Sequence, residues 1–269
     1  MLLKLRNFYE DFHNFFLLIV LFSFSLQAEQ QKNPEVGIVE KLDNTIPKDL
    51  KFVNSNGDTV KLGDIITKPT VLTLVFYHCT GICSPLLTNL AEVIDKTDLQ
   101  PGKDYQLITV SFDHHENIEA AQRWRKTHLE EMKKQIKPDD WRFLVGDSVS
   151  IRKLCDAVGF YFKPDGHDNF IHAGSLFFIS DNGKITRYLF GTEYNPFDFK
   201  LAILEAHKGL SMPTVNRMLK FCYSYDPEGR KYVFNITRII GTGMLLILGI
   251  FFATLFIVKS KKKKGDNNE

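Results

Sequence analysis

The feature that most restricts what this chain can form is an uncharged apolar run of twenty residues near its C-terminus, residues 239–258. At a rise of about 1.5 Å per residue, a helix of this length matches a hydrocarbon core of about 30 Å. Helices buried in soluble domains are rarely apolar on every side over such a length. A basic tail, residues 259–269 (KSKKKKGDNNE), follows the run and is expected in the cytoplasm by the positive-inside rule. We therefore predict a C-terminal transmembrane helix over 239–258, with the preceding residues outside the cytoplasm.

The N-terminus predicts the same topology independently. Lys4 and Arg6 precede an apolar run over 15–26, which is too short for a comfortable span, and the sequence then turns polar. This order is typical of a secretory signal peptide, here residues 1–28 with cleavage near Ala28. An uncleaved N-terminal anchor is the alternative, because two acidic residues stand unusually close before the run.

The charge balance argues against nucleic-acid binding through a basic surface as the main function of the chain. The chain has 34 Lys and Arg against 32 Asp and Glu, and five of the lysines lie in the last eleven residues. Residues 1–258 carry 29 basic and 30 acidic side chains, so we expect no nucleic-acid partner. Four cysteines are too few for a disulfide-stapled miniprotein, and no Gly-rich phosphate loop is present.

The middle of the chain, residues 45–210, is predicted to form one α/β domain. Two continuous apolar runs, TVLTLVFY and YQLITVSF, are typical of buried central strands. The expected order is hairpin 51–62, strand 70–77, helix 84–95, strand 105–112, helix 118–136, strand 141–145, helix 149–158, hairpin 175–190 and helix 197–207. This alternation predicts a mostly parallel central sheet with an antiparallel edge hairpin. Residues 29–44 are interpreted as a linker and residues 211–238 as a juxtamembrane segment.

Two cysteines mark the turn after the first long strand. The sequence HCTGICSP places Cys79 and Cys83 four positions apart between that strand and the next helix, at the edge of the sheet where ligands gather. The N-terminus of the helix is expected to favour the thiolate of Cys83. Thiolates serve both soft metals and disulfide exchange. Two ordinary buried cysteines are the alternative reading.

A Cys-x₃-Cys pair supplies only two ligands, and a structural zinc site needs four. Cu(I) accepts two thiolates and one imidazole. His13 lies in the predicted signal peptide, and His128 and His207 are expected on solvated helical faces. The remaining candidates for a third ligand stand near the sheet edge or in the loop before the late hairpin: His78, His114, His115, His167 and His172. Spacing alone does not choose among them.

The segments FYHCTGICSPLL, ITVSFD and FIHAGSLFFISDNGKI resemble the Sco/SenC family over residues 45–210. Members of that family are membrane-tethered copper proteins with a thioredoxin-like domain. The resemblance therefore implies a thioredoxin-like α/β fold. It also implies copper, as Cu(I) or Cu(II), bound by Cys79, Cys83 and His172, with the two cysteines able to form a redox disulfide. The family's aspartate falls on Asp113, which we interpret as a support for the ligands or, equally, as a turn or N-cap residue.

The chain departs from the commonest family pattern at three points. Thr80 stands where many members have proline, the pair Asp113-His114 replaces Asp-Pro, and the anchor is C-terminal. The juxtamembrane segment resembles a bacterial subgroup of the family. Cys155 is expected in the core, and Cys222 is expected to be a structural or unpaired thiol.

The resemblance implies a copper chaperone rather than an enzyme. Its client would be the copper-bearing subunit of cytochrome c oxidase, with an upstream copper donor. The domain would face the periplasm at the bacterial inner membrane. A thiol–disulfide oxidoreductase or redox sensor is the alternative function, and His172 separates the two, because thiol exchange needs no imidazole there. A peroxiredoxin-like peroxidase is disfavoured, because no convincing arginine partner for Cys79 is found.

Overall fold

The structure, a computed structural model, describes residues 34–166, 169–213, 223–226 and 231–234, together with residues 244, 248, 249 and 251. The predicted signal peptide and cytoplasmic tail lie outside the described residues, as does most of the predicted transmembrane segment. Among the residues described, no helix combines the length and the apolar character needed to cross a membrane.

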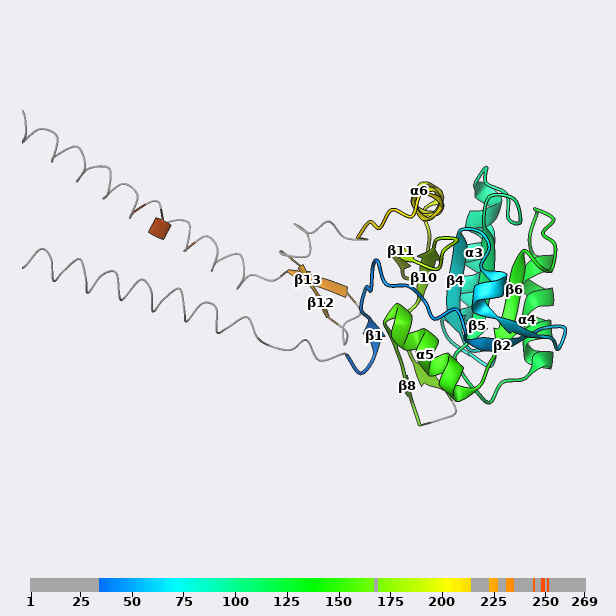
Figure 1. The fold of residues 1–269 in the computed structure, drawn as a ribbon. Helices are drawn as coiled ribbons and strands as arrows, with labels where there is room; N and C mark the ends of the chain where they lie inside the picture. The colour runs from blue at the N-terminus through cyan, green and yellow to red at the C-terminus, as the bar shows by residue number, and fades with distance from the viewer. Residues whose placement is uncertain are drawn as a thin grey trace, which may run out of the picture. The chain divides into compact units, whose positions relative to one another are not determined.

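A seven-stranded mixed sheet with the order β11-β10-β4-β5-β6-β2-β3 forms the centre of the domain (Figure 1). Its strands are β2 (Lys51–Asn54), β3 (Thr59–Lys61), β4 (Thr70–Val75), β5 (Gln106–Ser111), β6 (Trp141–Val145), β10 (Ser175–Ile179) and β11 (Ile185–Phe190). β4, β5 and β6 are parallel, and antiparallel hairpins complete both edges. Every residue of β4 and β5 is buried, as their continuous apolar runs predicted. The predicted parallel centre and late edge hairpin are confirmed.

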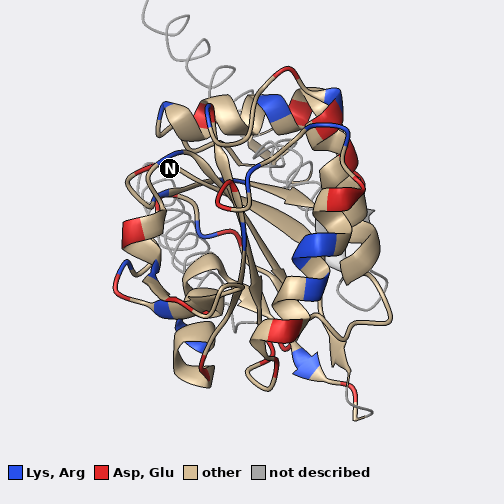
Figure 2. Ribbon diagram, turned by 90° about the vertical axis from the view of Figure 1, so that its right-hand side faces the viewer, with Lys and Arg blue, Asp and Glu red and all other residues tan. Residues whose placement is uncertain are grey.

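Helices cover both faces of this sheet. The described helices of the domain are α2 (Leu62–Ile65), α3 (Cys83–Lys96), α4 (Ile118–Glu130), α5 (Ser148–Val158) and α6 (Pro196–His207). Helix α3 contacts α4 and α6 on one face, and α5 lies on the other face, in front of the sheet in Figure 1. Figure 2 shows Lys and Arg interspersed with Asp and Glu over these elements, so neither sign of charge gathers in that view.

Three of the helices begin at side chains that cap their free backbone amides. The Asn117 side chain accepts from the backbone of Ala120, and Asp147 and Asn195 cap α5 and α6 in the same way. Such caps contribute about 1 kcal/mol each. They explain why the predicted starts of these helices lie within a residue or two of the observed ones.

Helix α4 is shorter than predicted, because it ends at Glu130 rather than at residue 136. The backbone amides of Lys133 and Lys134 donate to the carboxylate of Asp95 instead of continuing the helix. The ammonium group of Lys134 also donates to the carbonyl of Ile94, near the C-terminus of α3. Helix α4 therefore ends early, because the residues that follow it form hydrogen bonds with the C-terminal part of α3.

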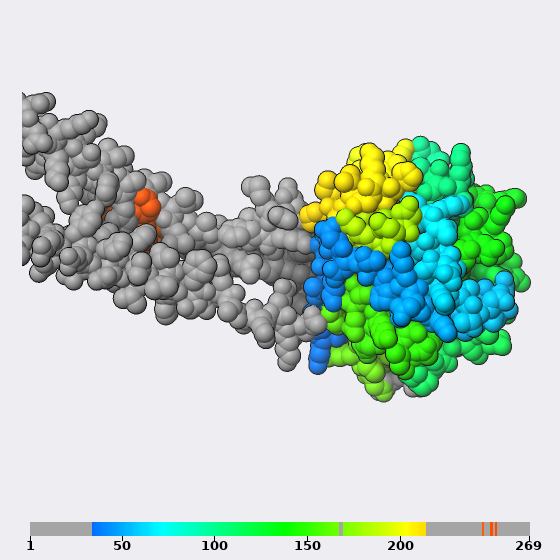
Figure 3. Space-filling view, viewed as in Figure 1, coloured from blue at the N-terminus to red at the C-terminus, as the bar shows by residue number. Residues whose placement is uncertain are grey.

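The segment before β2, interpreted above as a linker up to residue 44, contains a strand that packs on the domain. Strand β1 (Gly37–Ile38) pairs with β7 (Phe160–Tyr161), and the Val39 amide donates to Gly159. Gly159 has a φ of 67°, and the Val39 carbonyl leaves no space for a Cβ there. Figure 3 shows this segment in blue, running over the surface between α6 in yellow and α5 in green.

Two further short hairpins complete the description. Strand β8 (Lys163–Pro164) pairs with β9 (Phe170–Ile171), directly before β10. Strand β12 (Tyr223–Asp226) pairs with β13 (Lys231–Phe234) within the predicted juxtamembrane segment. The β8–β9 hairpin matters for function, because it brings the chain to the edge of the sheet where the cysteine turn lies.

Candidate metal centre

The cysteine turn joins the end of β4 to the start of α3. Cys79 donates its backbone amide to the Phe76 carbonyl at 3.3 Å, which closes the turn. Gly81 donates its amide to the Cys79 sulfur at 3.3 Å. Cys83 is the first residue of α3 and is fully buried, whereas Cys79 is half-buried. Both are free thiols. The fold therefore presents one sulfur towards solvent and holds the other in the core.

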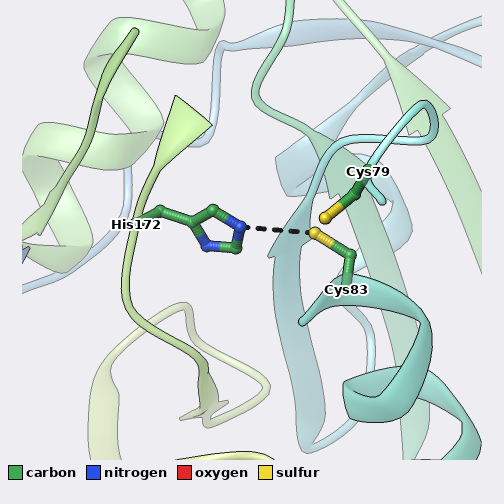
Figure 4. Close-up of side chains that lie close together, drawn as sticks. All are labelled: Cys79, Cys83 and His172. Atoms are coloured by element: carbon green, nitrogen blue, oxygen red, sulfur yellow. Dashed lines mark hydrogen bonds between the residues drawn. The ribbon is translucent and has the colours of Figure 1, made fainter. Parts of the chain in front are cut away.

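His172 enters from the opposite side, in the loop between β9 and β10. Its Nε2 lies 3.4 Å from the Cys83 sulfur (Figure 4). Its Nδ1 lies 3.1 Å from the carbonyl oxygen of Ala173, which can only accept a hydrogen bond. The proton is therefore assigned to Nδ1, and the lone pair of Nε2 points at the thiols. A backbone carbonyl that orients a histidine in this way is a common support for a metal ligand.

The three side chains form one group of candidate ligands. The sulfur atoms of Cys79 and Cys83 and a ring nitrogen of His172 all lie within 4.8 Å of one another. Figure 4 shows the two sulfurs, from the connection between β4 and α3, facing the imidazole, which comes from the loop between β9 and β10. The structure thus brings together the three residues that the resemblance selected.

Aromatic rings surround the imidazole. The centroid of the His172 ring lies 5.0 Å from that of Phe112, 5.9 Å from that of Phe76 and 6.0 Å from that of Phe160. A cavity of about 280 Å³ opens beside the site. Its wall consists of Phe76, Cys79, Thr80, Gly81, Ile82, Asp165, Asn169, Phe170, Ile171 and His172. The rings limit the rotation of His172 and exclude water from one side of the centre.

The two thiols differ sharply in acidity. A hydrogen bond from the Cys83 thiol lowers the pKa of Cys79 from 9.0 to about 4, and the backbone amides of Cys83 and Gly81 act in the same direction. Burial raises the pKa of Cys83 well above its ordinary value, and the neighbouring Cys79 adds to this. The expectation that the start of the helix favours the Cys83 thiolate is therefore wrong. Cys83 lies too deep for the helix N-terminus to offset desolvation.

Glu116 is a residue of this centre that sequence reasoning missed. Its side chain is only 1% exposed and accepts hydrogen bonds from the backbone amide of His78 at 2.7 Å and from His78 Nδ1 at 2.9 Å. The Ser111 hydroxyl also donates to it. Glu116 therefore fixes the residue directly before Cys79. The only available signal was an acidic residue three positions after a strand that ends in aspartate, which is too common to identify it.

Asp113 lies in the turn after β5. Its carboxylate accepts a hydrogen bond from the His115 amide at 3.0 Å, as a turn residue does. Among the described residues, no hydrogen bond joins Asp113 to Cys79, Cys83 or His172. The structure therefore places this carboxylate with its chain neighbours rather than against the candidate ligands.

The other histidines and cysteines are distributed differently. His207 is exposed on α6, as predicted, and Cys155 is buried in the core, as predicted. The prediction that His128 is solvated is wrong, because it is only 3% exposed. Its ring packs against Trp124 and Trp141, since α4 turns this position towards β6. His13, His167 and Cys222 lie outside the described residues.

This fold and site define a class of protein: a thioredoxin-like domain that carries a thiol-based metal or redox centre at the end of its first parallel strand. Residues 39–202 match the SCO1/SenC family. The chain belongs to this family.

Individual proteins and solved structures are also similar to this chain. The SCO1 protein homolog of Bacillus subtilis (strain 168) is 24% identical over 185 residues, which cover 67% of this chain and 88% of the relative. A crystal structure of a candidate electron transfer protein from Aquifex aeolicus VF5 is 30% identical with a TM-score of 0.57, and the match covers 62% of this chain and 95% of that one. A structure of Arabidopsis thaliana ScoI with copper bound is more distant, at 18% identity and a TM-score of 0.49, with coverage of 59% and 96%.

Proposed function

We propose that this protein is a membrane-tethered copper chaperone, which binds copper at Cys79, Cys83 and His172 and delivers it to the dinuclear copper centre of cytochrome c oxidase. The observation that carries the proposal is the convergence of two thiols and one imidazole, with their ligand atoms within 4.8 Å. Thiolates are soft ligands that select Cu(I), and imidazole is an accepted further donor. The family resemblance implies the same metal and the same three residues.

The donor set favours copper over structural zinc. Zinc in structural sites takes four protein ligands. Within the part of the chain that the structure describes, three candidate ligands gather here, and all are sulfur or imidazole. Three donors of this kind satisfy Cu(I) and leave room for a ligand from a partner.

Copper loading displaces a proton from this site. Metal binding requires both sulfurs to be deprotonated. Cys79 already has a lowered pKa, whereas Cys83 retains its proton and donates it towards Cys79. Cu(I) therefore replaces the Cys83 proton, which leaves to solvent, while the lone pair of His172 Nε2 is available without proton loss. Copper binding at this site therefore depends on pH, because the metal must displace the Cys83 proton.

The predicted topology sets the place of delivery. Residues 239–258 would anchor the chain in the bacterial inner membrane, with the domain on the periplasmic side and the basic tail in the cytoplasm. A tether raises the effective concentration of the donor near a client in the same membrane. The copper-bearing subunit of the oxidase is the proposed client, and an upstream donor would supply the copper.

The first test is copper stoichiometry on the reduced full chain under anaerobic conditions, with Cu(I) as the probe. We expect one Cu(I) per chain, lost in His172→Ala and retained in His207→Ala, which removes an exposed histidine from α6. Unchanged Cu(I) affinity in His172→Ala would overturn the ligand assignment. Transfer from the loaded chain to the isolated copper-bearing domain of the oxidase then tests delivery itself.

The asymmetry of the two thiols supports a second candidate function, thiol–disulfide exchange. The half-buried Cys79 thiolate would attack a client disulfide, form a mixed disulfide and release one client thiolate. Cys83 would then lose its proton and attack the Cys79 sulfur, which releases the second client thiolate and leaves a Cys79–Cys83 disulfide. This reaction does not need His172. Client reduction that survives His172→Ala, in a chain that binds no copper, would favour it over metal delivery.

A further inference from the structure

A second group of candidate ligands lies at the end of β5. Asp113, His114 and His115 each offer one ligand atom, and these atoms lie within 4.8 Å of one another. We propose that the three residues form an exposed metal site for a divalent first-row cation, with Cu(II) bound most tightly. The site proposed above consists of Cys79, Cys83 and His172 and is called the thiol centre below. None of the three residues at the end of β5 belongs to it, so the two sites are separate.

The donor chemistry differs from that of the thiol centre. One carboxylate and two imidazoles are harder donors than thiolates and suit divalent copper, nickel and zinc. Among these ions, Cu(II) generally has the highest affinity for a given nitrogen and oxygen site. The fold therefore offers a soft site for Cu(I) and a harder site for a divalent ion, one after each of two neighbouring parallel strands.

The turn geometry holds the ligands near one another. Ser111 Oγ accepts a hydrogen bond from the Asp113 amide at 3.1 Å, and Asp113 in turn accepts from the His115 amide at 3.0 Å. A carboxylate has about four lone-pair sites, so this bond leaves Asp113 with capacity for a cation. The ring centroids of His114 and His115 lie 3.9 Å apart.

Closure around an ion needs only side-chain movement. Metal–nitrogen bonds are about 2.0–2.1 Å long, so ligand atoms around one ion must approach more closely than the present 4.8 Å limit. Both histidines are exposed, and exposed side chains change rotamer freely. The backbone of the turn, held by its hydrogen bonds, does not have to move.

The charge of the segment favours a cation. Residues 113–119 (DHHENIE) contain three carboxylates and no Lys or Arg. Glu116 is buried against His78, so its carboxylate acts as fixed negative charge behind the turn rather than as a competing ligand. Glu119 lies in the first turn of α4. A cation that approaches this edge therefore meets negative charge without a basic neighbour in the segment.

The two sites stand next to each other on the sheet. Phe112 precedes Asp113 directly, and its ring contacts that of His172. β4 and β5 are parallel and in register from Thr70 to Val75, so the turns that follow them leave the same edge. A divalent ion at the exposed site would therefore lie beside the thiol centre without sharing its ligands.

The test removes the thiol centre first. In the full chain with Cys79→Ser and Cys83→Ser, titration with Cu(II) and electron paramagnetic resonance should show one Cu(II) with nitrogen and oxygen ligands in tetragonal geometry. Adding His114→Ala and His115→Ala should weaken this binding by about tenfold or more. Adding His207→Ala instead, which removes another exposed histidine, should leave it unchanged.

The outcomes separate this proposal from the proposed function. An unchanged Cu(II) affinity after loss of His114 and His115, or an equal loss in the His207→Ala chain, would overturn the exposed site. Both results are obtained without Cys79 and Cys83, so neither depends on Cu(I) binding at the thiol centre. The converse experiment loads the reduced His114→Ala, His115→Ala variant with Cu(I). If this variant still binds Cu(I), the thiol centre binds its metal independently of the exposed site.

Discussion

The Glu116 carboxylate accepts hydrogen bonds from both the backbone amide and the Nδ1 of His78, and it does so from a fully buried position. This pairing joins the segment after β5 to the residue that precedes Cys79. The residue directly before the more exposed thiol is thus held by a carboxylate that is not one of the three candidate ligands. A structural contact of this kind should influence both stability and the site.

We expect Glu116→Gln to destabilise the domain by about 1–3 kcal/mol, because the amide adds buried donors that face the His78 donors. Urea unfolding monitored by circular dichroism measures this change. Glu119→Gln is the matched control, since Glu119 is exposed three positions further on, and should change stability by less than about 0.5 kcal/mol. Equal effects of the two substitutions would show that the His78 pairing does not stabilise the turn.

Alkylation should distinguish the two thiols. Because the pKa of Cys79 is lowered to about 4, the rate of its reaction with iodoacetamide in the reduced, metal-free chain should be nearly flat from about pH 6 to pH 8. Cys83 should stay unlabelled, since it is buried. In Cys83→Ala the hydrogen bond to Cys79 is lost, and the rate should rise with pH. A rate that climbs about tenfold per pH unit in the unmodified chain would contradict the assignment.

The buried His128 should make stability depend on pH. Burial lowers its pKa below the ordinary value of 6.5, although Glu131, at 3.6 Å from Nδ1, acts in the opposite direction. The unfolded chain therefore binds this proton more readily than the folded chain does. Its contribution to stability is complete above about pH 6.5 and is lost as the pH falls through the folded pKa.

Thermal unfolding at about pH 8 and about pH 5 checks this expectation. The loss of stability between the two pH values should be smaller in His128→Phe than in the unmodified chain. His207→Ala, which removes an exposed histidine, should leave the loss unchanged. An undiminished loss in His128→Phe would mean that another group is responsible.

A buried hydroxyl pair between β4 and β5 should also be sensitive to substitution. Thr109 Oγ1 accepts from Trp141 Nε1 at 2.9 Å and lies 2.8 Å from Thr73 Oγ1. Thr109→Val keeps the shape but leaves the indole donor unpaired, which should cost about 1–3 kcal/mol in urea unfolding. Thr59→Val, on the exposed edge strand β3, should have almost no effect. A loss below about 0.5 kcal/mol at Thr109 would contradict this account.

Much of the fold follows from local pattern. The predicted strand 141–145 coincides with β6, and the two long apolar runs contain β4 and β5, because a strand buried on both faces needs apolar residues throughout. The C-terminus of α4 was not predictable in this way. It depends on Asp95, which lies in another helix and captures backbone amides that the local pattern assigns to α4.

The candidate site was likewise predictable only in part. Cys79 and Cys83 could be located from their spacing after a strand, whereas His172 was selected only by family resemblance. Glu116 and the burial of His128 escaped prediction, because a charged or imidazole side chain in a polar stretch is expected in solvent. Tertiary packing overrode that expectation at both positions.

The candidate ligands of the thiol centre lie far apart in the sequence. Cys79 and Cys83 are four positions apart, but His172 follows Cys83 by 89 positions. The imidazole reaches the sulfurs because β10 pairs with β4 and carries the preceding loop to the turn. An unfolded chain therefore presents the two thiols as neighbours, but only the folded sheet brings the imidazole of His172 to them. A metal that requires all three donors would therefore bind the folded domain and not the unfolded chain.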